Sequence, residues 1–182
     1  MSYSTQNSLL LTNLLEFYKN TENLDKMLGI INGDSKISLR IVDWFATNYA
    51  KKNYTVYEIE GETNRFKVYN DYKLKLKAYS KKRFDPFCRW ERIYIPYKEN
   101  NSIQTTIGQL NFFKWAIENN IINYIENNYE NIESDMNSRN STSKKKEKVL
   151  VDKKTRKKRE ELSLLASKSI KKEDVEITIQ FG

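Results

Sequence analysis

The stretch that most constrains the fold of this chain runs from Thr105 to Ile132 and reads TTIGQLNFFKWAIENNIINYIENNYENI. Its apolar residues recur at steps of three and four, which places them on one face of a helix. They are Leu110, Phe113, Ile117, Ile121, Tyr124, Ile125 and Ile132. Thr106 and Gln109 have the spacing of a capping box, so the helix is predicted to begin there. We expect one long helix, buried along one side, to organise the other elements.

Three shorter helices are predicted before this stretch. Residues 8–19 are rich in leucine, and a second helical segment over residues 23–31 ends at Asn32-Gly33, a typical left-handed stop. Ser35 is a plausible cap for the third helix, whose apolar stripe extends to Phe45. These helices are expected to form a layer against the long one.

Elsewhere the sequence alternates with the period of a strand. Residues 54–69 read as a hairpin that turns at Gly61, and residues 90–97 alternate around Pro96, which favours a strand near a sheet edge. Residues 175–181 alternate cleanly and are predicted to return to the sheet.

The segment 72–78 fits two structures. Tyr72, Leu74, Leu76 and Ala78 alternate with lysines, as in a strand that has one basic face. The spacing of Tyr72, Leu76 and Tyr79 also fits a helix, and we favour the strand. The predicted fold class is therefore α+β, with a mixed or antiparallel sheet of about four strands packed by helices that include the long one.

The domain organisation follows from a change in composition after Asp135. We expect a globular α+β core over residues 1–136, a basic, flexible and disordered insertion over 137–158, and a helix and C-terminal strand over 159–182 that return to the core. Residues 139–159 hold 11 basic side chains against Glu147 and Asp152, a composition typical of disordered segments.

Histidine is absent and Cys88 is the only cysteine. Ser-His-Asp and Cys-His catalysis are therefore excluded, together with histidine-ligated and structural zinc sites. No carboxylate pattern requires an enzyme, so we expect a protein without enzymatic activity, cofactor or metal. No segment approaches the roughly 20 apolar residues of a membrane span, so no membrane partner is expected.

The net charge of +8 is concentrated in two blocks. The C-terminal block is interpreted as a nucleic-acid contact, with a nuclear targeting signal and a solvated spacer as alternatives. Its candidate residues are Lys144, Lys145, Lys146, Lys153, Lys154, Arg156, Lys157, Lys158 and Arg159.

The second block lies between residues 73 and 92, and its candidate nucleic-acid-binding residues are Lys73, Lys75, Lys77, Lys81, Lys82 and Arg83. Four aromatic residues alternate with them, namely Tyr79, Phe84, Phe87 and Trp90. These rings could stack on the bases of a single strand. We favour the other interpretation, in which they are core residues and the lysines face water.

Four segments resemble an uncharacterised conserved protein family of mimivirus-like giant DNA viruses. They are ISLRIVDWF at 37–45, YKLKLKAYSKKRFDPFCR at 72–89, TTIGQLNFFKWAIENNI at 105–121 and KKREELSLLASKSI at 157–170. The resemblance implies a viral origin and carries over no catalytic residue.

Together these observations predict a non-enzymatic, basic viral protein that binds nucleic acid, DNA or RNA, mainly through the phosphate backbone. We expect it in the virion or in the host-cell cytoplasm at the viral factory, with the nucleus as an alternative. The alternative function is that of a structural or scaffold protein whose basic tail binds an acidic viral protein partner.

Overall fold

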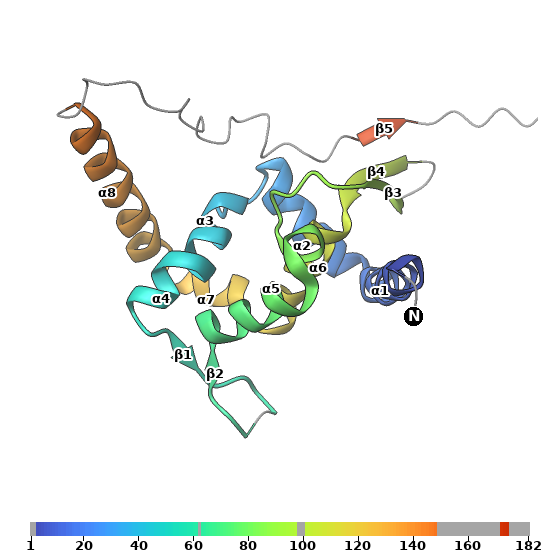
Figure 1. Cartoon of the computed structure of the whole chain (residues 1–182), viewed down its shortest axis with the longest axis horizontal. Helices are drawn as coiled ribbons and strands as arrows, with labels where there is room; N and C mark the ends of the chain where they lie inside the picture. The colour runs from blue at the N-terminus through green and yellow to red at the C-terminus, as the bar shows by residue number, and fades with distance from the viewer. Residues whose placement is uncertain (1–2, 62, 98–100, 149–171, 175–182) are drawn as a thin grey trace, which may run out of the picture.

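The computed structural model describes residues 3–61, 63–97, 101–148 and 172–174, and it combines helices with short strands (Figure 1). The helices are α1 (Tyr3–Tyr18), α2 (Thr21–Asn32), α3 (Leu39–Trp44), α4 (Ala50–Lys52), α5 (Val68–Phe84), α6 (Ile107–Glu118), α7 (Ile121–Asn127) and α8 (Tyr129–Lys148), and a π-helical turn, η1 (Phe45–Tyr49), joins α3 to α4. The strands are β1 (Val56–Tyr57), β2 (Phe66–Lys67), β3 (Arg92–Tyr97), β4 (Asn101–Thr106) and β5 (Lys172–Asp174). The predicted α+β class is confirmed.

The strands form two separate antiparallel sheets instead of the single sheet of about four strands that was expected. One contains β1 and β2, and the other has the order β3-β4-β5. The main hairpin pairs Arg92 with Thr106 at one end and Tyr97 with Asn101 at the other. The expectation of one sheet was wrong because the segment 72–78, which would have supplied a central strand, is helical.

The helical period of α5 places Tyr72 in the core, and Leu76 and Tyr79 pack partly buried against it. Leu74 decides between the two periods, because a strand would put it on the same face as Tyr72 and Leu76. It is 65% exposed. Lysine is also a good helix former, so the lysines of this segment favour the helix intrinsically.

The predicted long helix begins as expected but is broken twice. The Thr106 hydroxyl accepts the Gln109 N–H at 3.2 Å, which confirms the start of α6. The backbone then turns at Asn120, which has a left-handed φ of 55°, and again at Asn128. Asparagine tolerates the left-handed region, and its amide can cap a helix: Asn128 Nδ2 donates to the Tyr124 carbonyl at 2.9 Å. Three helices, α6, α7 and α8, therefore replace one.

The N-terminal and hairpin predictions agree more closely. Helices α1 and α2 are present, and α2 ends at Gly33 with φ 83°. The third helix is capped by Ser38, whose hydroxyl accepts the Ile41 N–H, and not by Ser35. The first hairpin is present as β1 and β2, with Gly61 at φ 86° in its turn.

The core is centred on the contact between α5 and α6. Their facing rings Tyr72, Phe84, Phe112 and Trp115 lie with neighbouring centroids 5.6–5.8 Å apart. Trp115 Nε1 donates to Asp71 Oδ1 at 2.6 Å, which satisfies the polar atom of a side chain that is otherwise buried.

Gly108 allows α6 to approach the end of α5 closely. A Cβ at this position would lie 2.7 Å from the Asp85 carbonyl oxygen and 3.3 Å from that of Lys82. Both are backbone atoms, so neither can move away without displacing α5. The register between the two helices therefore depends on a glycine.

Gly108→Ala should accordingly lower the free energy of unfolding by about 1–3 kcal/mol, the usual cost of overpacking. Gly29→Ala is the matched control, because Gly29 lies inside α2 and a Cβ there meets nothing within 4 Å. The control should be neutral or gain up to about 1 kcal/mol from helix propensity. Chemical denaturation measures both; equal stability of the two variants would contradict the close approach.

The first part of α8 is fixed to α3 and α4 through Asp135. Its carboxylate accepts Trp44 Nε1 at 3.1 Å and Lys52 Nζ at 2.8 Å, and Arg139 Nε lies 3.7 Å away. Burial alone would raise the pKa of Asp135, but the bonds from Lys52 and Trp44 and the charges nearby outweigh it and lower the pKa. Ile132 and Met136 of the same helix are buried.

Because the folded state lowers the pKa of Asp135, its carboxylate stabilises the fold at neutral pH, and this contribution is lost as the pH falls through the folded pKa. Asp135→Asn should cost about 1–3 kcal/mol near neutral pH. The difference from the parent should shrink below about pH 4. Urea unfolding across this range measures it, with Glu130→Gln, an exposed carboxylate on α8, as control. A loss that does not depend on pH would contradict the assignment.

The described part of the expected flexible insertion is helical, since α8 continues to Lys148 and crosses the expected boundary at 136/137. In Figure 1 this helix extends away from the rest of the chain. Strand β5, at Lys172–Asp174, pairs with β4. The strand predicted over 175–181 lies outside the described residues, and the domain boundaries stay a prediction.

Candidate functional site

The outer face of α5 carries the second basic block of the sequence. Lys73 and Lys77 are exposed and lie four residues apart, a spacing that keeps side chains on one side of a helix. The helix is kinked at Ser80, which has φ 64° and ψ 167°, and the exposed Lys81 follows this kink. Lys82 is also exposed, whereas Lys75 and Arg83 are partly buried. The structure therefore brings this group together on one kinked helix, with Lys73, Lys75 and Lys77 before the kink and Lys81, Lys82 and Arg83 after it, and not on the strand face that was expected.

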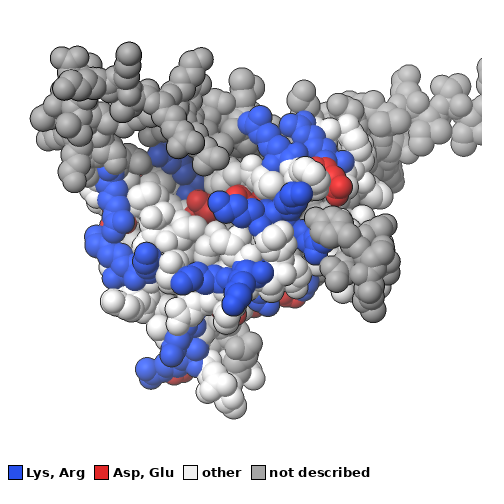
Figure 2. Space-filling model, in the orientation of Figure 1, with Lys and Arg blue, Asp and Glu red and all other residues white. Residues whose placement is uncertain are grey.

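Within the ranges that the structure describes, the lysines of this block have no carboxylate partner: no ion pair involves Lys73, Lys75, Lys77, Lys81 or Lys82. Ion pairs on other elements join Lys19 with Glu16, Lys26 with Glu22, Lys52 and Arg139 with Asp135, Arg65 with Glu58, and Lys114 with Glu118. Figure 2 shows Lys and Arg side chains spread over the face on which α5 lies.

Aromatic rings accompany the lysines at two points. Lys82 Nζ lies 3.6 Å from the centroid of the Trp90 ring. Lys73 and Lys51 each place Nζ 5.6 Å from the Tyr69 ring centroid. Such contacts stabilise a cation by about 0.5–1 kcal/mol at exposed sites, so the lysines are partly fixed without being neutralised.

The four aromatic residues of the basic block divide between the two interpretations. Phe84 is completely buried, and Tyr79 and Phe87 pack partly buried against the core. Trp90 is 45% exposed. The core interpretation fits the first three, and Trp90 remains a surface ring beside Lys82.

Sequence analysis missed two residues on the same side. Arg92 and Tyr94 lie on the outward face of β3, and Tyr94 is 56% exposed. The signal that could have found them is the alternation over 90–97, which gives even-numbered positions a common face.

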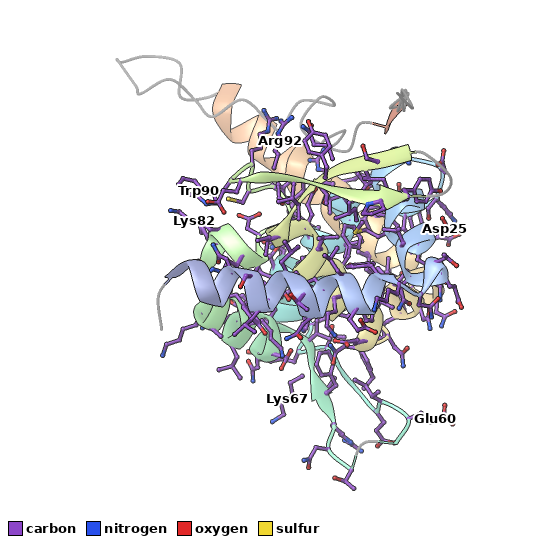
Figure 3. All side chains as sticks on the ribbon, turned by 90° about the vertical axis from the view of Figure 1, so that its right-hand side faces the viewer. Asp25, Glu60, Lys67, Lys82, Trp90 and Arg92 are labelled. Carbon is purple, nitrogen blue, oxygen red and sulfur yellow. The ribbon has the colours of Figure 1, made fainter. Side chains whose placement is uncertain are left out.

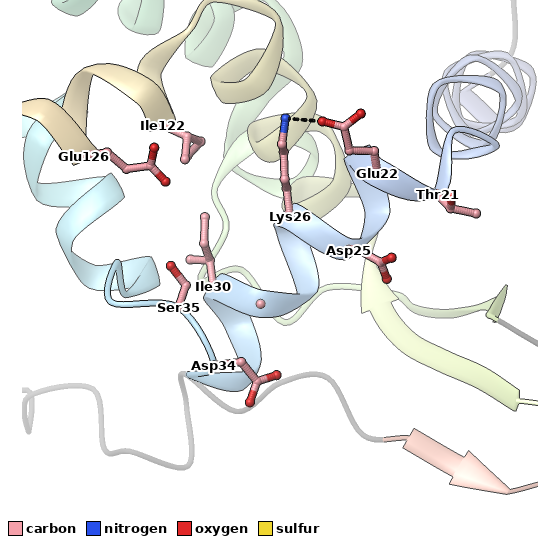
Figure 4. A pocket seen from close by; sticks show the side chains of 10 residues that line it. Thr21, Glu22, Asp25, Lys26, Ile30, Asp34, Ser35, Ile122 and Glu126 are labelled. Carbon is pink, nitrogen blue, oxygen red and sulfur yellow. Dashed lines mark ion pairs between the residues drawn. The ribbon is translucent and has the colours of Figure 1, made fainter.

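An acidic groove borders the far end of β3, where the Tyr97 hydroxyl donates to Asp25 Oδ1 at 3.1 Å. Figure 3 shows Lys82 and Trp90 at one edge of the molecule and Asp25 at the other. The groove, of about 580 Å³, lies between α2 and α7 (Figure 4). Its charged lining is Glu22, Asp25, Lys26, Asp34 and Glu126, around Ile30 and Ile122. Lys26 is already paired with Glu22 at 2.7 Å, so the charge of the groove is negative.

The C-terminal basic block is described only in part. Lys144, Lys145 and Lys146 belong to the last turns of α8. Lys153, Lys154, Arg156, Lys157, Lys158 and Arg159 lie outside the described residues. The role predicted for this block therefore stays a prediction.

One carboxyl beneath α5 is electrostatically unusual. Burial, and then the negative charge of Asp85, raise the pKa of Asp43 to about 7. The Asp85 carboxylate itself accepts the N–H of Phe87 at 2.9 Å, which fixes the turn after α5. In the described part of the chain, no group of three or more His, Cys, Asp or Glu side chains could hold a metal ion.

A raised pKa means that the folded state binds a proton more tightly than the unfolded chain. The contribution of Asp43 to stability therefore falls as the pH rises from about 4 to about 7. Asp43→Asn should be more stable than the parent by at least about 1 kcal/mol near pH 8, and equal to it near pH 4. Thermal melts at both pH values measure this, and Asp34→Asn is the exposed control. Equal melting temperatures near pH 8 would contradict the burial of the charge.

The profile of a family described as "Family of unknown function (DUF7197)" matches residues 3–180. The chain belongs to this family. It is also 50% identical over 129 residues to "Uncharacterized protein L507" of Acanthamoeba polyphaga mimivirus. The resemblance to an uncharacterised giant-virus family is thus confirmed.

The match covers 67% of this chain and 49% of the mimivirus protein, so the chain spans about half the length of that curated relative. No solved structure matches the chain. Among the described helices, none is long and apolar enough to cross a membrane.

Proposed function

We propose that this protein is a non-enzymatic viral protein that binds nucleic acid through its phosphate backbone, and that the outer face of α5 is the contact surface. The observation that carries the proposal is the group of exposed lysines on α5, which have no carboxylate partner among the residues that the structure describes. A lysine already paired with an acid gains little from a phosphate, because it must first give up its partner. Unpaired lysines release condensed counterions from the nucleic acid when they bind.

The distribution of charge supports the same surface. The acidic groove between α2 and α7 repels phosphates, and its Asp25 lies at the edge of the molecule away from Lys82 and Trp90 in Figure 3. A polyanion that approaches the molecule is therefore steered toward α5. Lysines that contact phosphates do not read the edges of the bases, so binding should discriminate little between nucleic-acid sequences.

The C-terminal block would add to this surface if it contacts the same ligand. The 50% identical mimivirus protein supports a viral setting, so we place the protein in the virion or at the cytoplasmic viral factory. An acidic viral protein partner is the alternative ligand, because aspartate and glutamate side chains would satisfy the same lysines.

Replacing Lys77 and Lys81 together with glutamine tests the proposal, since glutamine keeps helix propensity and removes charge. The slope of log affinity against log salt should fall by up to about 0.9 per lost contact on duplex, and about 0.7 on a single strand. Fluorescence anisotropy with labelled single-stranded and duplex oligonucleotides of several sequences measures this.

The matched control replaces Lys19 and Lys26, which are exposed and paired with Glu16 and Glu22. It removes the same charge from another surface and should leave the slope unchanged. Serine replacement of the six basic residues between 153 and 159 measures the contribution of the C-terminal block. If the parent binds neither DNA nor RNA at about 50 mM salt but binds polyglutamate, the acidic-partner alternative replaces this proposal.

A further inference from the structure

We propose that the ligand of this surface is single-stranded nucleic acid, and that its bases stack on Trp90 and Tyr94 while the α5 lysines hold its phosphates. This inference rests on the proposed function and adds the class of ligand. It is carried by two exposed aromatic rings, Trp90 at 45% and Tyr94 at 56%, beside basic side chains that have no carboxylate partner in the described part of the chain.

The β3–β4 hairpin presents one of these rings, Tyr94, on its outward face. Ile95 is 3% exposed and Ile93 packs against the core, so the odd-numbered positions of β3 face inward. Arg92 and Tyr94 consequently face outward. More than half of the Tyr94 surface is open to solvent. A core role for this ring is therefore excluded.

Tyr94 is held in place by its neighbours across the strand pair. Gln104 lies directly opposite in the register and donates Nε2 to the Tyr94 hydroxyl at 2.7 Å. Arg92 Nη1 donates to Gln104 Oε1 at 2.9 Å. The ring is thus ordered before any ligand arrives, which lowers the entropy lost on binding. The guanidinium has five N–H donors and keeps others for a phosphate.

Trp90 supplies the second ring beside α5. Its contact with Lys82 is between an exposed ammonium and the ring face, 3.6 Å from the centroid. A base takes the place of the ammonium on the ring, and Lys82 turns to the adjacent phosphate. Figure 3 shows Lys82, Trp90 and Arg92 on the same side of the molecule. Stacking and charge neutralisation therefore occur at one place.

This combination selects a single strand over a duplex. In a duplex the base faces stack on one another, so only phosphates would reach the protein and the two rings would gain nothing. In a single strand each base can leave its neighbour for a ring, at about 1–3 kcal/mol per base. Stacking tolerates every base, which agrees with the lack of base-specific contacts expected from lysines.

The test compares oligo(dT), oligo(rU) and a mixed-sequence duplex on the full chain. The parent should bind the better of the two single strands more tightly than the duplex at equal salt. Trp90→Ala should weaken that binding about 5- to 150-fold, the fold-change that corresponds to one stacked base. Duplex affinity and the salt slope should stay unchanged, because no phosphate contact is removed.

Conservative variants separate stacking from a structural role. Trp90→Phe and Tyr94→Phe keep a ring and should retain most of the affinity, although Tyr94→Phe breaks the bond from Gln104. Tyr94→Leu keeps bulk without a ring and should lose affinity. Quenching of tryptophan fluorescence by oligo(dT) should largely vanish in Trp90→Phe, because Trp115 is buried and Trp44 is only partly exposed. Unchanged thermal melting of all four variants shows that the fold is intact.

The inference and the proposed function fail in different ways. No binding to any of the three probes overturns both. Duplex binding that depends on Lys77 and Lys81, with single-strand affinity unaffected by Trp90→Ala and Tyr94→Leu, overturns this inference alone. Loss of affinity in Tyr94→Phe equal to that in Tyr94→Leu also overturns it, since the hydrogen bond and not the ring would then matter.

Discussion

The contact between α5 and α6 is the constraint on which the rest of the structure depends. Gly108 lets the α6 backbone reach the Asp85 carbonyl, and Trp115 reaches across to Asp71. Once these two helices are seated, the rotation of α5 is fixed, and Tyr72 is buried. The lysines then have only the outer face left to occupy. Core packing therefore determines where the lysines lie, although it does not require the residues at these positions to be basic.

The sequence predicted the elements that depend on local chemistry. The Thr106 cap, the Gly33 stop and the first hairpin follow from short-range rules and are present. The strand predicted over 72–78 failed because alternation and helical spacing coexist there, and only the exposure of Leu74 separates them. Tertiary packing against α6 decided between the two periods, and the helix propensity of lysine is a local signal that pointed the same way.

The helix break at Asn120 and the pairing of the surface lysines were also not predictable from the sequence. Asparagine signals a turn only weakly, so a long apolar period concealed the end of α6. Charge counts located the basic block correctly, but pairing depends on which carboxylates the fold brings near. Lys26 and Lys77 look alike in the sequence, yet one faces Glu22 and the other faces no acid in the described chain. Trp90 was recognised as an aromatic residue of the basic block, but only the structure shows that it is exposed.

An uncompensated row of like charges has an energetic cost that the fold has to offset. Lysines at four-residue steps repel one another by a few tenths of a kcal/mol per pair. Pairing them with glutamates, as α2 does for Lys26, would remove this repulsion and stabilise α5. The contacts of Lys73 with Tyr69 and of Lys82 with Trp90 offset part of this repulsion, and the two ammonium groups keep their charge. A bound polyanion would relieve the remainder, so under the proposed function ligand binding would stabilise the helix that presents the lysines.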